Sequence, residues 1–286
     1  MEKLIDMHTH TNYSDGELSP EELIQLAISK NIKALAITDH NTIEGIKTIN
    51  RNSSLIINSG INIINGIELS AKVDQGTMHI LGYNIDINNA ILNKKLRTLK
   101  DNSINSVLSI LEQIKRDYDI IFGYEDIRKL INTNHNLGRI DIAKLCIKYG
   151  YASNIKDAFN KYLISAYNKT RDMKKMNYQE CLELIRNSGG IPVLAHPKSL
   201  NLPEKEFLIL LKDMIKYGLE GIEVYHSTHT PEEMSYYHQI ANQYNLLISG
   251  GSDYHGKGIK PDIELGTGKN HNLKIKQLSL LDKLQS

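Results

Sequence analysis

The segment Lys3-Leu4-Ile5-Asp6-Met7-His8-Thr9-His10 joins a short hydrophobic run to two histidines that are two residues apart. We expect a β-strand here, and residues two apart in a strand point to the same face. His8 and His10 can therefore direct two imidazole nitrogens into one small volume. The same spacing recurs near the other end of the chain, at Asp253 and His255. Together the two segments predict a metal site whose ligands come from both ends of the sequence.

Further short hydrophobic runs precede polar residues that suit metal chemistry. They are 34–37 before His40, 61–67 before Glu68, 191–195 before His196, 221–225 before His226 and 246–249 before Asp253. Helical patterns separate many of these runs, for example the one that starts at Ser19-Pro20 with an N-cap serine and a proline in the first turn. This alternation predicts an α/β fold with a largely parallel sheet. In a sheet closed into a barrel, chemistry gathers where the strands end.

Residues 88–177 interrupt this alternation. Hydrophobic residues in 91–115 recur at nearly helical spacing, and shorter helical patterns follow at 124–131, 139–149 and 155–163. We expect a helical insertion that forms a substrate cap. The barrel is then discontinuous, with residues 1–87 and 178–286 packing together to form one site.

The composition is that of a globular protein. Of 286 residues, 41% are hydrophobic and 23% charged, and the net charge is +1. Such a charge provides no general field for long nucleic acid or an anionic membrane. Cys146 and Cys181 show no metal or redox spacing. We expect no leader segment, and no run reaches the roughly 18 apolar residues that a membrane span needs. The expectation is a cytoplasmic protein with no membrane association and no obligate protein partner.

The donors near strand ends form one large set. A lone histidine is usually an ordinary surface or core residue, but six of the eleven histidines fall in this set. One ion takes about four to six ligands, so the set indicates two or three divalent ions, with Mn, Fe or Zn as candidates and Mn favoured. The predicted ligands are His8, His10, Asp15, His40, Glu68, His79, His196, Asp253 and His255.

Several of these residues stand in motifs that resemble those of the PHP (polymerase and histidinol phosphatase) superfamily. The motifs are Met7-His8-Thr9-His10, Tyr13-Ser14-Asp15-Gly16, Ile37-Thr38-Asp39-His40, Gly66-Ile67-Glu68, Ala195-His196-Pro197 and Gly251-Ser252-Asp253-Tyr254-His255-Gly256. Within that superfamily the chain is most similar to 3',5'-nucleoside bisphosphate phosphatases and RNase AM-like 5'-to-3' oligoribonucleases. The resemblance implies a distorted (β/α)7 barrel. It also implies three ligand sets, namely His8, His10, Glu68 and Asp253; Glu68, His79 and His196; and Asp15, His40 and His255.

Four further residues are candidates for contact with substrate. In the resembling enzymes an arginine in a Gly-Arg segment of the insertion contacts substrate phosphate, and Gly138-Arg139 matches it. Asp141 stands where the family often has a histidine, which weakens the match for a second phosphate pocket. His229 aligns with another phosphate contact, so Arg139 and His229 are the predicted catalytic residues. Lys169 and His226 are further substrate-binding candidates. The alternatives are a solvated arginine at a helix start, a surface histidine, and an exposed loop around Lys169.

These observations predict a metal-dependent phosphoesterase. Two closely spaced cations can activate a nucleophile at neutral pH and hold the attacking and leaving oxygens. We expect hydrolysis of phosphate monoesters of small nucleotides, of the 3',5'-nucleoside bisphosphate type, with 5'-to-3' trimming of short RNA as a further activity. A histidinol phosphatase and a non-catalytic metal-binding scaffold are the alternatives.

Overall fold

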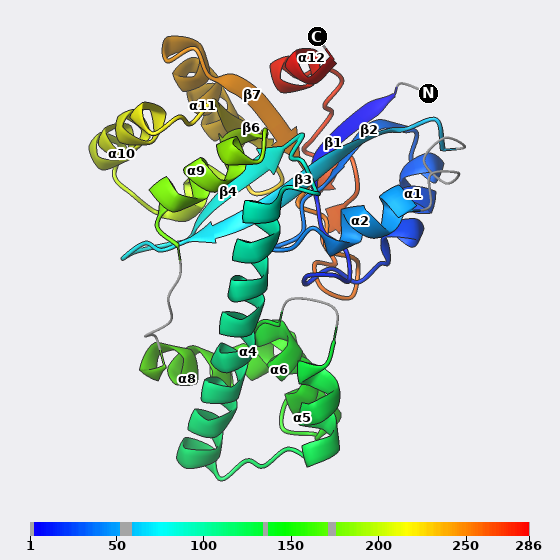
Figure 1. Cartoon of the computed structure of the whole chain (residues 1–286), viewed down its shortest axis with the longest axis vertical. Coiled ribbons are helices and arrows are strands. Elements are labelled where there is room, and N and C mark those ends of the chain that lie inside the picture. The colour runs from blue at the N-terminus through cyan, green and yellow to red at the C-terminus, as the bar shows by residue number, and fades with distance from the viewer. Residues whose placement is uncertain (1–2, 52–58, 134–136, 171–175, 286) are drawn as a thin grey trace. The chain divides into compact units, whose positions relative to one another are not determined.

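The computed structural model describes residues 3–51, 59–133, 137–170 and 176–285. The chain divides into two compact units (Figure 1). One consists of Met1–Lys94 and Lys175–Ser286, and we call it the barrel unit. The other is Lys95–Lys174, which we call the helical unit. The barrel unit is thus built from two separate stretches of the sequence.

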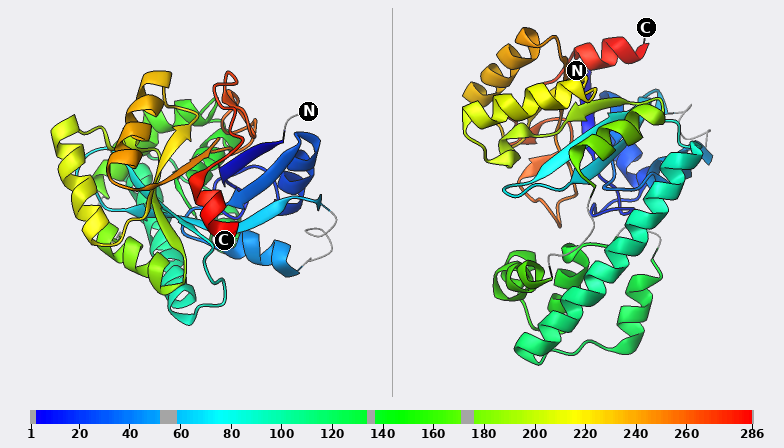
Figure 2. Two further views of the ribbon diagram at one scale, coloured as in Figure 1. Left: turned by 90° about the horizontal axis from the view of Figure 1, so that it is seen from above. Right: turned by 60° about the vertical axis from the view of Figure 1, so that its left-hand side comes forward.

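Seven strands of the described residues form one sheet, in the order of their sequence. The strands are β1 (Leu4–Thr9), β2 (Ile32–Ile37), β3 (Asn62–Ala71), β4 (Met78–Tyr83), β5 (Ile191–Leu194), β6 (Gly221–His226) and β7 (Leu247–Gly251). The sheet curls into a nearly closed barrel with helices around it (Figure 2). The predicted α/β barrel fold is confirmed.

Strand β4 makes the sheet mixed, because it runs antiparallel to both β3 and β5. The remaining neighbours are parallel, as the sequence predicts. Only residues 72–77 connect β3 to β4. A parallel connection requires a crossover of a dozen or more residues, so these two strands must form an antiparallel pair. The start of β4 consequently lies at the edge of the sheet where the parallel strands end.

The two ends of the sheet are joined by hydrogen bonds between β1 and the segment after β7. Asp253 N–H donates to His8 O at 2.8 Å, and His10 N–H donates to Tyr254 O at 2.9 Å. The backbones approach closely at Gly251, where a Cβ atom would lie 2.3 Å from His8 N. Glycine is therefore required at this position. This closure brings the N-terminal and C-terminal motifs together.

Two helices of the barrel unit begin at an N-cap residue followed by proline and acidic residues, a signal present at Ser19 and repeated at Thr230. Ser19 and Glu22 form a capping box at the start of α1, and Thr230 and Glu233 form one at the start of α11. The helices are α1 (Pro20–Ser29), α2 (Glu44–Arg51), α9 (Tyr178–Asn187), α10 (Glu204–Lys216), α11 (Pro231–Gln243) and α12 (Ser279–Gln285), with a 3-10 turn, η2 (Pro197–Leu200). A small hairpin, β8 (Ile263–Glu264) and β9 (Gly268–Lys269), completes the unit.

The helical unit has a hydrophobic core of its own, which includes Ile114, Ile142, Cys146 and Leu163. The helices are α4 (Ala90–Tyr118), which starts before the unit boundary, α5 (Tyr124–Ile131), α6 (Arg139–Lys148), α7 (Ile155–Ala158), a π-helical turn η1 (Phe159–Leu163) and α8 (Ile164–Lys169). Helix α4 is continuous over 91–115, where hydrophobic residues recur at nearly helical spacing. In the part of the chain that the structure describes, no helix is long and apolar enough to cross a membrane.

Candidate metal centre

All nine predicted donors lie in the barrel unit, at the edge where the parallel strands end. Glu68 lies inside β3, which continues to Ala71 rather than ending at Ile67 as the sequence predicts. His79 is the second residue of strand β4. Because β4 is antiparallel to its neighbours, its start lies at the edge where the parallel strands end. Seven donors are in or after strands of parallel pairs: His8, His10 and Asp15 with β1, His40 with β2, His196 with β5, and Asp253 and His255 with β7.

The strand predicted at Asp253 and His255 is wrong. Strand β7 ends at Gly251, and Asp253 has a left-handed φ of 57°. Aspartate tolerates this conformation better than most residues, and the bond from its N–H to His8 O holds it there. The turn still directs both side chains into the centre.

The first group of donors consists of His8, His10, Glu68 and Asp253, all buried. Glu68 Oε2 lies 3.3 Å from His8 Nε2 and 3.2 Å from His10 Nε2. Asp253 Oδ1 lies 3.5 Å and 3.2 Å from the same two nitrogens. Two imidazoles and two carboxylates thus converge on one point, in the combination that the family resemblance implies for one ion.

The second group uses the other oxygen of Glu68. Glu68 Oε1 lies 2.8 Å from His79 Nδ1 and 3.0 Å from His196 Nε2. The two nitrogens are 3.2 Å apart. His40 Nδ1 instead lies 3.1 Å from Glu68 Oε2, the oxygen that faces the first group. Because its two oxygens face different groups, Glu68 can bridge two ions.

The third group lies beside the first. Asp15 Oδ1 is 3.1 Å from His255 Nε2 and 3.6 Å from His10 Nδ1, and Asp15 Oδ2 is 3.8 Å from His40 Nε2. His255 Nδ1 donates a hydrogen bond to Asp253 O at 2.9 Å, which leaves Nε2 as the ring nitrogen that faces Asp15. His10 faces Glu68 through Nε2 and Asp15 through Nδ1. His40 faces Glu68 through Nδ1 and Asp15 through Nε2.

Among the described residues, several donor atoms of the centre lack hydrogen bonds, which shows that these residues fit metal ions. His8 Nε2, His10 Nε2, Glu68 Oε2 and Asp15 Oδ1 are buried side-chain atoms that make no hydrogen bond within the described residues. Buried polar atoms in folded proteins rarely lack a hydrogen-bond partner. Ring nitrogens and carboxylate oxygens that face one another around a common point are satisfied together by a divalent cation.

Two outer residues fix the protons of ligand histidines. Glu223 Oε1 accepts a hydrogen bond from His8 Nδ1 at 2.9 Å, and Glu223 Oε2 accepts one from His196 N–H at 2.8 Å. His196 Nδ1 donates to Ser199 Oγ at 2.8 Å, because Ser199 Oγ itself donates to Thr77 O. In the neutral rings of His8 and His196, Nε2 is therefore the nitrogen available to an ion.

The loop that carries Asp15 is held by Asp39. Its carboxylate accepts hydrogen bonds from Thr11 N–H, Thr11 Oγ1 and Ser14 Oγ, each at 2.7 Å. Asp39 is buried and does not itself face the donor groups. It supports the loop between His10 and Asp15.

Electrostatics favour the charged form of the shared carboxylate. Burial would raise the pKa of Glu68, but His40, His79 and His8 outweigh it and hold that pKa well below its usual value. Burial opposes protonation of His10, yet Asp253 and Glu68 raise its pKa to about 9. Burial lowers the pKa of His40 to about 3. Ion binding at His10 therefore displaces a proton, whereas His40 is ready to bind.

Residues 6–249 match the family model of the PHP domain. The chain belongs to the PHP family. The 5'-3' exoribonuclease Rnm of Escherichia coli is 31% identical to this PHP chain over 265 residues, which cover 92% of the chain and 88% of that protein. The 3',5'-nucleoside bisphosphate phosphatase of Chromobacterium violaceum is 25% identical over 254 residues, covering 89% and 88%. A crystal structure described as a metal-dependent phosphoesterase from Bifidobacterium adolescentis matches with a TM-score of 0.79 and 28% identity, covering 93% of this chain and 92% of that one.

The predicted resemblance to PHP phosphoesterases is thus confirmed. This PHP protein is a metal-dependent phosphoesterase, a hydrolase that acts on phosphoester bonds. Family membership favours the enzyme over the non-catalytic scaffold.

Two predicted substrate residues belong to the helical unit of the PHP protein. Arg139 is the exposed first residue of α6, and its guanidinium lies over the rings of Tyr167, at 4.3 Å, and Phe159, at 5.4 Å. Lys169 is the last residue of α8 and pairs with Asp117 at 2.8 Å. It lies at a helix end rather than in the exposed loop considered as an alternative.

The other two, His226 and His229, follow β6 in the barrel unit. Thr228 N–H donates to His226 Nδ1, so the proton of the neutral ring is on Nε2, which lies 3.5 Å from Asp253 Oδ2. His229 is buried, so the alternative of a surface histidine is wrong. His229 Nδ1 donates to Val224 O at 2.9 Å, and burial lowers its pKa to about 4. His229 Nε2 is a buried atom that makes no hydrogen bond within the described residues, and the contact of His229 with substrate phosphate stays a prediction.

Two residues of the centre, Glu223 and Lys260, are not among the predicted site residues. Glu223 occupies a strand position from which it reaches two predicted ligands. Lys260 Nζ lies 2.6 Å from Asp253 Oδ2 and was not predicted to belong to the centre. The segment Gly256-Lys257-Gly258-Ile259-Lys260 could have indicated it, because glycines directly after a ligand pair allow the chain to turn back over the site.

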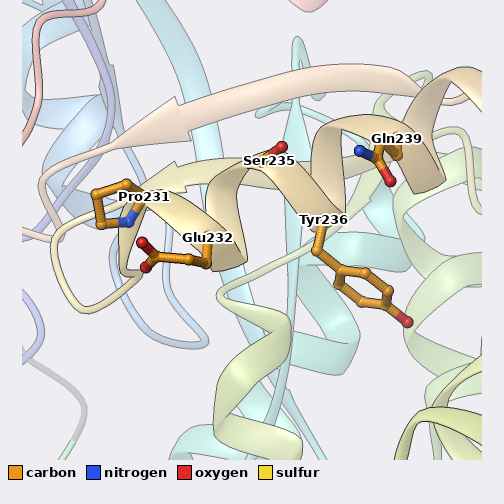
Figure 3. A pocket seen from close by; sticks show the side chains of 5 residues that line it. All are labelled: Pro231, Glu232, Ser235, Tyr236 and Gln239. Atoms are coloured by element: carbon orange, nitrogen blue, oxygen red, sulfur yellow. The ribbon is translucent and has the colours of Figure 1, made fainter.

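A hollow lined by residues of α11 contains none of the donors. It is shown in Figure 3 and is lined by Pro231, Glu232, Ser235, Tyr236 and Gln239. The chemistry of this PHP protein therefore centres on the nine donors and not on that hollow.

Proposed function

We propose that this PHP phosphoesterase hydrolyses a phosphate monoester of a small nucleotide, of the 3',5'-nucleoside bisphosphate type, and that it also trims short RNA from 5' to 3'. The observation that carries the proposal is the position of Glu68, whose two oxygens face two different donor groups. Two relatives support the substrate class, since one is named a nucleoside bisphosphate phosphatase and another a 5'-3' exoribonuclease.

The proposed cofactors are two or three divalent ions held by the nine donors, with Mn as the working ion. Mixed imidazole and carboxylate ligation suits Mn, Fe and Zn. Ions at these donors would supply an activated nucleophile and neutralise phosphoryl charge. Glu68 would be shared between two such ions, while Glu223 and Ser199 orient the imidazoles of His8 and His196. Elemental analysis of protein purified without added metal tests the identity and number of ions.

Within the helical unit we propose Arg139 as a contact for substrate phosphate. Two aromatic rings hold its exposed guanidinium, which has a planar array of donors suited to phosphate. Lys169 is a weaker candidate because Asp117 already neutralises it. Replacing Arg139 with alanine should raise the KM for a bisphosphate more than it lowers kcat, whereas Lys169→Ala should change neither much.

The deciding experiment compares three substrates with Mn-loaded protein. These are adenosine 3',5'-bisphosphate, a short 5'-phosphorylated RNA and histidinol phosphate. Release of phosphate or mononucleotides from the first two, lost in Glu68→Gln, supports the proposal. Preference for histidinol phosphate would replace it with the histidinol phosphatase alternative, and hydrolysis of none of the three would contradict it.

A further inference from the structure

Lys260 is placed over the metal centre by a tight turn after the last ligand. Gly256 has φ of 100°, and Gly256 O accepts hydrogen bonds from Ile259 N–H at 3.2 Å and Lys260 N–H at 2.9 Å. Gly258 N–H donates to Glu17 Oε2 at 2.8 Å, which ties the turn to the segment after β1. The position of Lys260 is therefore set by backbone hydrogen bonds and not by its side chain alone.

The ammonium of Lys260 contacts the outer oxygen of a proposed ligand. Lys260 Nζ lies 2.6 Å from Asp253 Oδ2, while Asp253 Oδ1 faces His8 and His10. Lys260 thus leaves the oxygen that faces the first donor group free for an ion.

Lys260 also has donors left for a ligand. An ammonium has three N–H groups, and its contact with Asp253 Oδ2 uses one. Its side chain is 34% exposed, whereas that of His8 is fully buried and that of Asp253 is 12% exposed. A substrate that approaches the ions therefore meets Lys260 at the rim of the centre.

We propose that Lys260 binds the phosphoryl group of the substrate, donating from Nζ to a non-bridging oxygen while it holds Asp253 in place. Three ligand carboxylates, those of Asp15, Glu68 and Asp253, offset part of the charge of two or three divalent ions, and Lys260 adds one positive charge beside them. The resulting positive centre matches a phosphate dianion. This inference rests on the phosphoesterase function and does not depend on which nucleotide carries the phosphate.

Lys257, in the same turn, provides a matched control. It forms an ion pair with Glu264 and donates to Pro261 O, away from the donor groups. Replacing it removes the same charge from the same turn. A general loss of positive charge would therefore affect both variants, whereas a direct contact with phosphate would affect Lys260 alone.

The test measures binding of inorganic phosphate to Mn-loaded protein by calorimetry, together with metal content per chain. Lys260→Met should bind phosphate about tenfold or more weakly, equivalent to about 1.4 kcal/mol, with metal content unchanged. Lys260→Arg should retain most of the affinity, and Lys257→Met should match the wild type. A KM raised more than kcat is lowered, for any hydrolysed monoester, would agree with this.

Three results would overturn the inference. Equal phosphate affinity in Lys260→Met and the wild type would show that Lys260 does not contact phosphate. Loss of an ion in Lys260→Met would mean that the lysine only maintains the ion site. Wild-type protein that holds its ions but binds no phosphate would overturn both this inference and the proposed function, which separates that failure from the first two.

Discussion

At the scale of single residues, Glu223 supports two proposed ligands at once. It accepts the Nδ1 proton of His8 and the backbone N–H of His196, a residue whose φ of 23° is unusual for a non-glycine. Glu223→Gln keeps the size of the side chain and removes the charge that fixes the proton of His8. We expect ion affinity to fall about 10- to 100-fold, as for other partners of ligand histidines.

Competition with a chelator measures this change directly. Glu220→Gln is the matched control, because Glu220 is an exposed acid just before β6. Unchanged ion affinity in Glu223→Gln would show that the proton of His8 needs no carboxylate partner.

His229 predicts a dependence of stability on pH. Burial lowers its pKa to about 4, below the value of about 6.5 in an unfolded chain. The unfolded state therefore binds more protons between these values, so the stabilisation is fully present above pH 6.5 and is lost as the pH falls toward 4. The loss amounts to at most about 3 kcal/mol.

Urea unfolding of metal-free protein at several pH values tests this prediction. His229→Gln, which can still donate to Val224 O, should lose less stability between pH 6.5 and 4 than the wild type. His271→Gln, at an exposed position, should behave like the wild type. Parallel curves for the wild type and His229→Gln would contradict the prediction.

At the scale of elements, Asp6 joins β1 to the chain beyond β7. Its carboxylate accepts hydrogen bonds from Ser252 N–H at 2.8 Å, Ser252 Oγ at 2.6 Å, Gly266 N–H at 2.8 Å and His8 N–H at 3.3 Å. In Asp6→Asn, an amide NH2 would face donors. We expect the free energy of unfolding to fall by about 3 kcal/mol, since buried donors lose their acceptor.

Denaturant unfolding measures the effect, with Asp262→Asn as control. Asp262 is 70% exposed and lies 3.9 Å from Lys269, so its replacement should change stability by less than about 0.5 kcal/mol. Equal stability of the two variants would mean that Asp6 does not close the barrel.

The elements also show what the sequence could and could not predict. Capping residues and hydrophobic runs predicted α1, α11 and the parallel strands, because these signals are local. The antiparallel strand β4 escaped prediction because its direction depends on pairing with β3. The turn at Asp253 escaped prediction because its left-handed conformation depends on the hydrogen bond to His8 in β1. Glu223 and Lys260 reach the centre through tertiary contacts between distant segments, which spacing along the chain does not encode. Single histidines are weak evidence for a metal site, and they indicate one only once the fold brings the strand ends that carry them to the same edge of the sheet.

At the scale of the whole molecule, all nine donors lie in the barrel unit, and so do Glu223 and Lys260. The helical unit has a core of its own. We propose that it acts as a substrate cap, which would assign ion binding to one unit and part of substrate selection to the other.

Replacement of residues 95–174 with a short Gly/Ser linker tests this division. The shortened protein should keep the ion content of the full chain, because it retains every proposed ligand and the residues that orient them. It should hydrolyse adenosine 3',5'-bisphosphate with a much higher KM, since Arg139 is removed, while inorganic phosphate should still bind through Lys260. Ion content is measured by elemental analysis and folding by circular dichroism. A folded barrel without ions would show that the donors of the barrel unit are insufficient, and an unchanged KM would show that the helical unit does not select the substrate.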